Sequence, residues 1–261
     1  MAHDHLIELL DLDAEVLHEY FRDVIGWVGR EATAQPHVVD LGAGTGTGSL
    51  ALARELPGST VTAVDLSPEM LSHLRDRADA AGLGDRIRTV EADLDQPWPD
   101  LRPVEVIWAA ASMHHMKDPA TALASAYGML RPGGLLVIAE LESFPHFLTG
   151  TPDEEVERRW HAEAAKRRQE AGLHMHENWG ERMRQAGFTS VTERHFDIDL
   201  RPPAPAATTR YARATLSRMR HGLEGRLSAL DLSALEQTVA GLATRADLSV
   251  RTGRTVWLAR R

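Results

Sequence analysis

The sequence contains no cysteine among its 261 residues. This absence excludes disulfides, a thiolate nucleophile and any metal site built on cysteine. The 13 histidines show no HExxH spacing, so the sequence predicts no metal site. No apolar run approaches the roughly 18 residues that span a bilayer, and the first residues lack the basic and apolar segments of a signal peptide. We therefore expect no membrane partner and a cytoplasmic location.

Basic residues are in the minority, because 29 Lys and Arg face 38 Asp and Glu and leave a formal net charge of −9. The mean field of such a chain repels a polyanion, so nucleic acid is not an expected partner. A hydrophobic content of 43% with 26% charged residues is ordinary for a globular protein. The length suffices for a sizeable core.

Short apolar segments alternate with segments of helical character over the first half of the chain. The expected strands cover residues 37–41, 60–65, 87–91, 104–108 and 135–139, and the expected helices cover 12–28, 50–56, 68–81 and 119–130. Parallel strands need crossover connections, so this order predicts an α/β doubly wound fold whose sheet has helices on both faces.

The regular alternation of strands and helices ends after Glu140. We expect helices over residues 153–170, 179–186, 208–223 and 232–243, and strands over 191–200 and 254–260. Because the last strand needs a partner, the chain is predicted to form one domain, with residues at about 207–247 inserted within the same sheet.

A loop with four glycines, VDLGAGTGTGS, follows the first expected strand. A triphosphate loop would need the pattern GxxxxGKS or GxxxxGKT, but no lysine precedes Lys117. A dinucleotide loop would need GxGxxG, and Thr47 and Ser49 occupy the third glycine position in the frames that begin at Gly42 and Gly44, which weakens that alternative. Asp40, just before the loop, would repel pyrophosphate and attract an ammonium or sulfonium group.

Carboxylates also follow the next two expected strands. Asp65 lies where a carboxylate can accept hydrogen bonds from two ribose hydroxyls, and Asp93 lies where it can accept from an adenine amino group. The alternative is that Asp65 only caps a strand end and that Asp93 is only solvated.

Five segments in this order resemble the class I methyltransferases that use S-adenosylmethionine, in the branch that acts on small molecules (methyltransferase type 11/12-like). They are VVDLGAGTGTGSL at 38–50, VTAVDLSPEML at 61–71, EADLDQPWP at 91–99, VEVIWAAASMHHMKDP at 104–119 and LRPGGLLVIAE at 130–140. The resemblance implies a Rossmann-like, mostly parallel seven-stranded sheet with an antiparallel last strand and added helices as a cap. It also implies S-adenosyl-L-methionine as cofactor and S-adenosyl-L-homocysteine as product.

The resemblance implies a role for each matching residue. The backbone of the glycine loop would lie against the methionine part of the cofactor, and Asp65 would bind its ribose. Residues after the third strand would lie on either side of its adenine. The implied cofactor-binding set is Asp40, Gly42, Ala43, Gly44, Asp65, Leu66, Asp93, Leu94, Ala109 and Ala110. Where many relatives have a polar residue, this chain has alanines at 109–111, so an amino-group contact there could come only from a backbone carbonyl.

The resemblance also implies how the single domain is divided. Residues 1–35 would form an N-terminal helical lid, 36–142 the cofactor-binding core and 143–187 a helical cap. Residues 188–261 would supply the last two strands and the insertion at 207–247. That insertion would either cap the acceptor pocket or serve core packing and a homodimer. Arg210, Arg213, Arg218 and Arg220 are interpreted as a solvated helix face rather than a substrate site.

The chain lacks an NPPY-like tetrapeptide, which together with its acidic charge favours a small-molecule acceptor. Methyl transfer is an in-line displacement that needs alignment and, for some acceptors, a base. Histidine is the expected base, with His114 and His146 as the candidates and His174 with His176 as a further pair. The alternative for His114 is a role in shaping its loop.

Three functions remain compatible with these motifs. The first is methyl transfer to oxygen, nitrogen or carbon of a small metabolite in a biosynthetic pathway. The second is a methyltransferase-fold protein that binds the cofactor but catalyses cyclisation or elimination. The third is a regulatory module that binds the cofactor without turnover.

Overall fold

The computed structural model describes residues 2–101 and 103–261, and the chain divides into two compact units. Unit 1 comprises Met1–His18, Leu141–Met175 and Phe196–Arg254. Unit 2 comprises Glu19–Glu140, His176–His195 and Thr255–Arg261. Among the described residues, no helix combines the length and apolar character required to cross a membrane.

The described residues form one seven-stranded sheet with the order β3-β2-β1-β4-β5-β7-β6. Its strands are β1 His37–Leu41, β2 Thr60–Asp65, β3 Ile87–Glu91, β4 Val104–Ala110, β5 Leu130–Leu141, β6 Thr189–Leu200 and β7 Val250–Arg260. The pairs β1·β2, β1·β4, β2·β3 and β4·β5 are parallel. Gly133 and Gly134 exchange backbone hydrogen bonds with Arg261, which makes β7 antiparallel to β5. The predicted fold class is confirmed.

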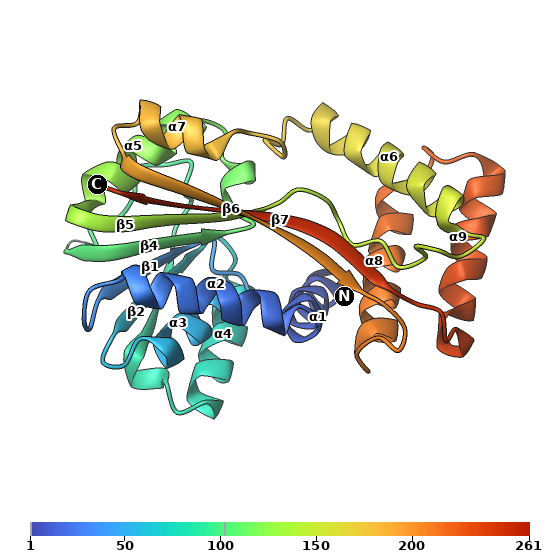
Figure 1. Ribbon diagram of the computed structural model, residues 1–261, viewed down its shortest axis with the longest axis horizontal. Helices are drawn as coiled ribbons and strands as arrows, with labels where there is room; N and C mark the ends of the chain where they lie inside the picture. The colour runs from blue at the N-terminus through green and yellow to red at the C-terminus, as the bar shows by residue number, and fades with distance from the viewer. Residues whose placement is uncertain (1, 102) are drawn as a thin grey trace. The chain divides into compact units, whose positions relative to one another are not determined.

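Helices cover both faces of the sheet in unit 2. Figure 1 shows α3 Thr47–Glu55 and α4 Pro68–Ala80 on one face, and α5 Pro119–Met129 and α7 Trp179–Gln185 on the other. Ser67 caps α4 as the sequence predicts, because its Oγ accepts a hydrogen bond from the Met70 amide at 3.3 Å. The fully apolar strand residues between these layers, such as Val39, Val64 and Ile107, are completely buried.

The order of the strands decides where functional groups gather. Parallel strands β2, β1 and β4 end at Asp65, Leu41 and Ala110, so the loops that follow them lie at the same edge of the sheet. In doubly wound folds, ligands bind at this carboxyl edge, near the point where the strand order reverses. Here the reversal lies between β1 and β4.

The N-terminal segment differs from the single helix expected over residues 12–28. The structure has α1 Ala2–Val16 and α2 His18–Glu31, separated at Leu17. The apolar periodicity predicted the buried positions, since Leu12, Val16 and Val24 are all at most 2% exposed. The expected helix began at Leu12 and left out the start of α1, although Leu6, Leu9 and Leu10 already have helical spacing.

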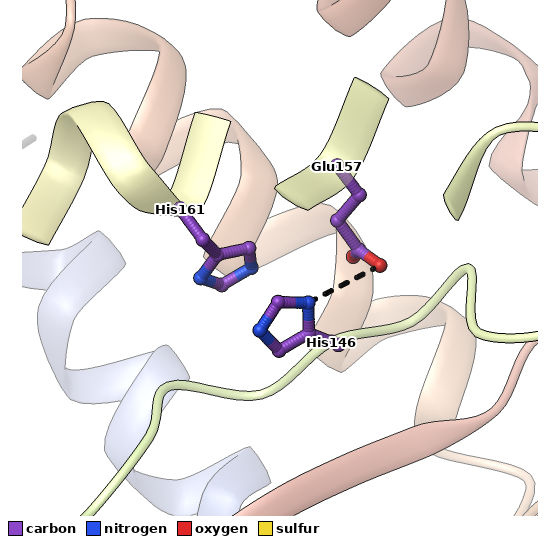
Figure 2. A group of neighbouring side chains, drawn as sticks. All are labelled: His146, Glu157 and His161. Atoms are coloured by element: carbon purple, nitrogen blue, oxygen red, sulfur yellow. Dashed lines mark ion pairs between the residues drawn. The ribbon is translucent and has the colours of Figure 1, made fainter. Parts of the chain in front are cut away.

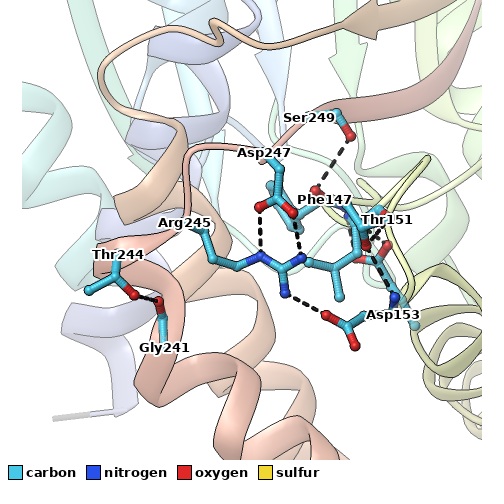
Figure 3. A network of polar contacts seen from close by, with 10 residues as sticks. Phe147, Thr151, Asp153, Gly241, Thr244, Arg245, Asp247 and Ser249 are labelled. Atoms are coloured by element: carbon cyan, nitrogen blue, oxygen red, sulfur yellow. Dashed lines mark hydrogen bonds and ion pairs between the residues drawn. The ribbon is translucent and has the colours of Figure 1, made fainter.

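Unit 1 contains α1 and three further helices, α6 Glu154–Glu170, α8 Thr208–Gly222 and α9 Ala229–Gly241. Helix α8 contacts α1, α6 and α9, and the Phe147 and Tyr211 rings meet edge to face with centroids 5.3 Å apart. Arg245 joins two segments of this unit (Figure 3), with both Asp247 oxygens accepting from it at 2.8 and 2.9 Å and Asp153 at 2.6 Å.

Candidate cofactor site and its histidines

The amide groups of the glycine loop after β1 donate hydrogen bonds to other groups of the protein. The amides of Gly42 and Ala43 donate to the Val64 carbonyl at 2.8 and 3.0 Å. The Gly44 amide donates to Asp65 at 2.8 Å, and the Gly46 amide donates to the Ala43 carbonyl at 2.9 Å. A phosphate-binding loop offers such amides to its ligand. All four amides already donate to groups of the protein. This agrees with the sequence analysis, which rejected a phosphate-binding loop.

The Asp65 carboxylate ties the glycine loop to the end of β2. One of its oxygens accepts from the Gly44 amide at 2.8 Å and the other accepts from the Ser67 amide at 2.9 Å. Each carboxylate oxygen keeps a second lone pair, so the side chain can still accept hydrogen bonds from two hydroxyls. Leu66 beside it exposes 64% of its surface and offers an apolar side chain at the same edge.

Asp40 is buried beneath the loop, with 2% exposure, and its carboxylate accepts a 2.6 Å hydrogen bond from the Ser49 hydroxyl. Burial raises the pKa of Asp40, the hydrogen bond from Ser49 offsets part of that rise and the nearby charge of Asp65 adds to it, so that the pKa is about 7. Asp40 therefore carries its full negative charge only above neutral pH. The attraction for a cation that the sequence suggested depends on this titration.

Gly42 and Gly46 meet close neighbours in left-handed backbone conformations. Gly42 has φ +69°, and a Cβ there would lie 2.5 Å from the Ser112 Cβ. Gly46 has φ +83°, and a Cβ there would lie 2.3 Å from the Leu74 Cγ. Only glycine satisfies both conditions without moving a neighbour. These two glycines are thus required by packing as well as by any ligand that approaches the loop.

Thr47 gives the loop an available polar group. Its Oγ1 is buried in the first turn of α3 and has no hydrogen-bond partner among the described residues. Unpaired buried hydroxyls are costly, so such an atom indicates a place where a bound group completes the hydrogen bond. The loop therefore fits a ligand that brings its own polar atoms.

The remaining predicted cofactor residues lie along the same edge in unit 2. Asp93 accepts a hydrogen bond from the Asp95 amide at 2.9 Å, and the partly buried Leu94 packs against the core. Ala109 is completely buried, whereas Ala110 is partly exposed at the end of β4. Ala111 follows with φ +51°, which is uncommon for a residue with a Cβ and frequently marks a functional turn.

His114 lies directly after this turn and is held by Glu140 at the end of β5. Its Nδ1 lies 2.7 Å from a carboxylate oxygen of Glu140, and its backbone amide donates to the other oxygen at 3.2 Å. Both side chains are buried, with 6% and 4% exposure. A carboxylate accepts, so it selects the tautomer with the proton on Nδ1 and leaves the Nε2 lone pair to accept a proton.

His146 belongs to unit 1 and has different partners. Its ring stacks on His161 with centroids 3.8 Å apart, and its Nδ1 lies 3.7 Å from an oxygen of Glu157 (Figure 2). Burial lowers the pKa of His161 to about 3, and the neighbouring His146 and Arg168 lower it further. The structure thus places the two predicted bases in separate units, each beside a buried glutamate.

The arginines of α8 lie on a solvated face, with Arg210, Arg213 and Arg218 exposed and Arg220 partly exposed. Arg210, Arg213 and Arg218 line a cavity of about 550 Å³ in unit 1, together with His5 and Glu8 of α1. Arg210 lies 3.5 Å from Glu8, and Arg220 lies 3.2 Å from Glu236 of α9.

Sequence reasoning missed the partners of the predicted residues. Glu140 was visible as an acid at a strand end, but its pairing with His114 depends on the side-chain direction at the end of β5. Ser112, which closes against Gly42 and donates to the Leu41 carbonyl at 2.7 Å, left no pattern in the sequence. The left-handed turn at Ala111 also had no glycine to signal it.

Part of this chain is similar to known proteins. Residues 38–134 match the family described as "Methyltransferase domain". The demethylmenaquinone methyltransferase of Thermus thermophilus is 36% identical over 113 residues, which are 43% of this chain and 50% of that protein. The 27-O-demethylrifamycin SV methyltransferase of Amycolatopsis mediterranei is 30% identical over 160 residues, which are 55% of this chain and 58% of that protein. The chain thus spans about half the length of these curated relatives.

Solved structures show the same fold at low identity. A methyltransferase from Geobacter sulfurreducens, in complex with S-adenosyl-L-homocysteine, has a TM-score of 0.52 and 19% identity, covering 92% of this chain and 90% of that chain. The cyclase SpnF has a TM-score of 0.53 and 21% identity, covering 92% and 81%. The sheet order and these structures show a Rossmann-like methyltransferase fold, and residues 38–134 of this chain are similar to a methyltransferase domain.

Proposed function

We propose that this protein transfers a methyl group from S-adenosylmethionine to oxygen, nitrogen or carbon of a small-molecule metabolite. The observation that carries the proposal is the glycine loop, whose Gly44 amide is fixed by Asp65 while Thr47 Oγ1 stays unpaired. The groups at this edge fit a nucleoside with an amino-acid end, because Asp65 offers a carboxylate, Leu66 an apolar side chain and Thr47 an unpaired hydroxyl. The small-molecule acceptor is supported by the acidic chain and by relatives named for quinone and rifamycin substrates.

The residues that would hold the cofactor are those at the carboxyl edge of unit 2. Gly42, Ala43 and Gly44 present backbone to the methionine part, and Asp65 accepts from the ribose hydroxyls. Leu66, Asp93 and Leu94 flank the adenine, and carbonyls at Ala109 and Ala110 meet the amino group. Asp40 supports the loop from below through Ser49. S-adenosylmethionine supplies an electrophilic methyl group.

His114 is the proposed general base of this site. It follows β4 in the same unit as the glycine loop, and Ser112, two residues earlier, is the residue against which Gly42 packs. The Glu140 carboxylate holds the imidazole by both its ring and its amide, so the ring cannot rotate freely. A positioned base of this kind contributes about a hundredfold to ten-thousandfold to proton-transfer steps.

Incubation with methyl-labelled S-adenosylmethionine and a metabolite extract tests the proposal. Label in a small organic product, dependent on the protein, is the expected result. Tight cofactor binding without any labelled product would contradict methyl transfer and favour either cyclisation or elimination chemistry or a regulatory role. A control with Asp65→Ala should lose both binding and label.

A further inference from the structure

A buried cluster in unit 1 combines two imidazoles and one carboxylate. His146 lies after β5, whereas Glu157 and His161 lie one turn apart on α6, so all three reach the same point. One ligand-type atom from each side chain lies within 4.8 Å of the other two. No other group of three such residues meets this condition within residues 5–101 and 103–261.

One ring nitrogen of His161 has no hydrogen-bond partner inside this cluster. The residue is only 8% exposed, and its Nε2 has no hydrogen-bond partner among the residues that the structure describes. A buried polar atom without a partner costs about 1–3 kcal/mol. Figure 2 shows a nitrogen of each stacked ring on the side that faces the Glu157 carboxylate. The unpaired atom therefore points toward the other two potential ligands.

Backbone amides hold the Glu157 carboxylate in place. It is completely buried, and its two oxygens accept from the amides of Phe147 at 2.7 Å and Leu148 at 2.9 Å. Hydrogen bonds of this kind orient a ligating carboxylate and are typical of outer contacts in metal sites. Because the two amides follow His146 in the chain, they also fix that histidine beside the carboxylate.

We propose that His146, Glu157 and His161 bind one divalent transition-metal ion of the zinc type. Two imidazole nitrogens and a carboxylate oxygen are a ligand set that zinc accepts, and three protein ligands leave one position open. Tetrahedral zinc holds its ligand atoms about 3.4 Å apart. The 3.7 Å between His146 Nδ1 and the Glu157 oxygen is close to that value. Binding would turn the two rings out of their stacked arrangement so that both nitrogens point at the ion.

The ion would join the segment after β5 to α6 within unit 1. The His146 side chain keeps 25% of its surface exposed, so solvent reaches this ligand, whereas Glu157 is completely buried. This site is independent of the methyl-transfer proposal, because none of its three residues is required by the cofactor edge in unit 2.

Metal binding to the full-length, chelator-treated protein tests the site. Titration with zinc chloride should give one tight site per chain in calorimetry and raise the unfolding temperature. Cobalt chloride should give the visible absorption of a tetrahedral cobalt site. Absence of both effects would overturn the proposal directly, whatever the variants do.

Two ligand variants and a control assign the binding. His161→Gln and the more exposed His146→Gln should each weaken zinc binding by at least about tenfold, with circular dichroism showing that the fold is kept. His18→Gln replaces an exposed histidine and should bind as the wild type does. Equal zinc affinity in the wild type and both ligand variants would mean adventitious binding at surface histidines and would overturn the proposal.

Discussion

Nδ1 of His114 lies 2.7 Å from a carboxylate oxygen of Glu140, and both side chains are buried. The pair joins the turn after β4 to the end of β5, on the edge that carries the glycine loop. A histidine fixed in this way has one nitrogen committed to its carboxylate partner and one available for proton transfer.

His114→Gln should lower kcat by at least about a hundredfold with the labelled acceptor, because glutamine cannot accept the proton. Cofactor affinity should stay near the wild-type value, since the glycine loop is untouched. His115→Gln changes the exposed neighbour whose ring lies 4.1 Å away, and it serves as the matched control. Full turnover by His114→Gln would remove this residue as the base.

Asp40→Asn should stabilise the protein at alkaline pH. The pKa of Asp40 is raised from 3.8 to about 7, so between those values the folded chain keeps a proton that the unfolded chain releases. The free energy of unfolding therefore falls as pH rises through this window and stays lowered above it. Asparagine mimics the protonated acid, accepts from Ser49 and avoids that loss.

Urea unfolding of wild type and Asp40→Asn at pH 5 and pH 9 measures this effect. The free-energy difference in favour of the variant should grow by an amount on the order of 1–4 kcal/mol between the two conditions. A difference that does not change with pH would show that Asp40 is ionised in the folded protein throughout.

Gly46→Ala should destabilise the protein more than Gly82→Ala. Both glycines have positive φ, +83° and +67°, so both variants incur the backbone penalty. Only Gly46 would also press its Cβ against Leu74, and overpacking typically costs about 1–3 kcal/mol more. Equal losses in denaturant unfolding would mean that Leu74 can move away without cost.

Arg245→Gln should weaken unit 1, where Arg245 bridges Asp153 and Asp247 and is itself 18% exposed on its side chain. Its hydrogen bond lowers the pKa of Asp247, so this contribution is present above the ordinary pKa of an aspartate and is lost as pH falls below it. The aspartates are about half exposed, so a loss of about 1 kcal/mol is expected after screening by solvent. Hydrogen exchange of α6 amides, compared with Arg251→Gln as control, should show it.

The strands of unit 2 could be predicted because they are short apolar runs, and their order follows from the crossover rule. The start of β5 could not, because Arg131, Pro132, Gly133 and Gly134 have the composition of a turn. The structure extends β5 to Leu130, and Arg261 pairs with Gly133 and Gly134. Pairing with a distant segment overrides local propensity there.

The cofactor edge could be predicted in outline for a similar reason. Residues directly after parallel strands share one edge whatever their side chains do, which placed Asp65 and Asp93 correctly along the sheet. Partners such as Glu140 for His114 depend on which way a side chain points at the end of a strand. The spacing of Glu157 and His161 is readable on a helix, but nothing in the sequence brings His146 to them.

Calorimetric titration of S-adenosylmethionine into wild type, Asp65→Ala and Asp85→Ala tests the central claim most directly. Asp65 lies between the Gly44 and Ser67 amides, whereas Asp85 is an exposed carboxylate before β3 in the same unit. Loss of two hydroxyl hydrogen bonds to a charged acceptor should weaken binding by at least about a hundredfold in Asp65→Ala. Asp85→Ala should bind like the wild type. Undiminished affinity in a folded Asp65→Ala variant would contradict the cofactor site described for this edge.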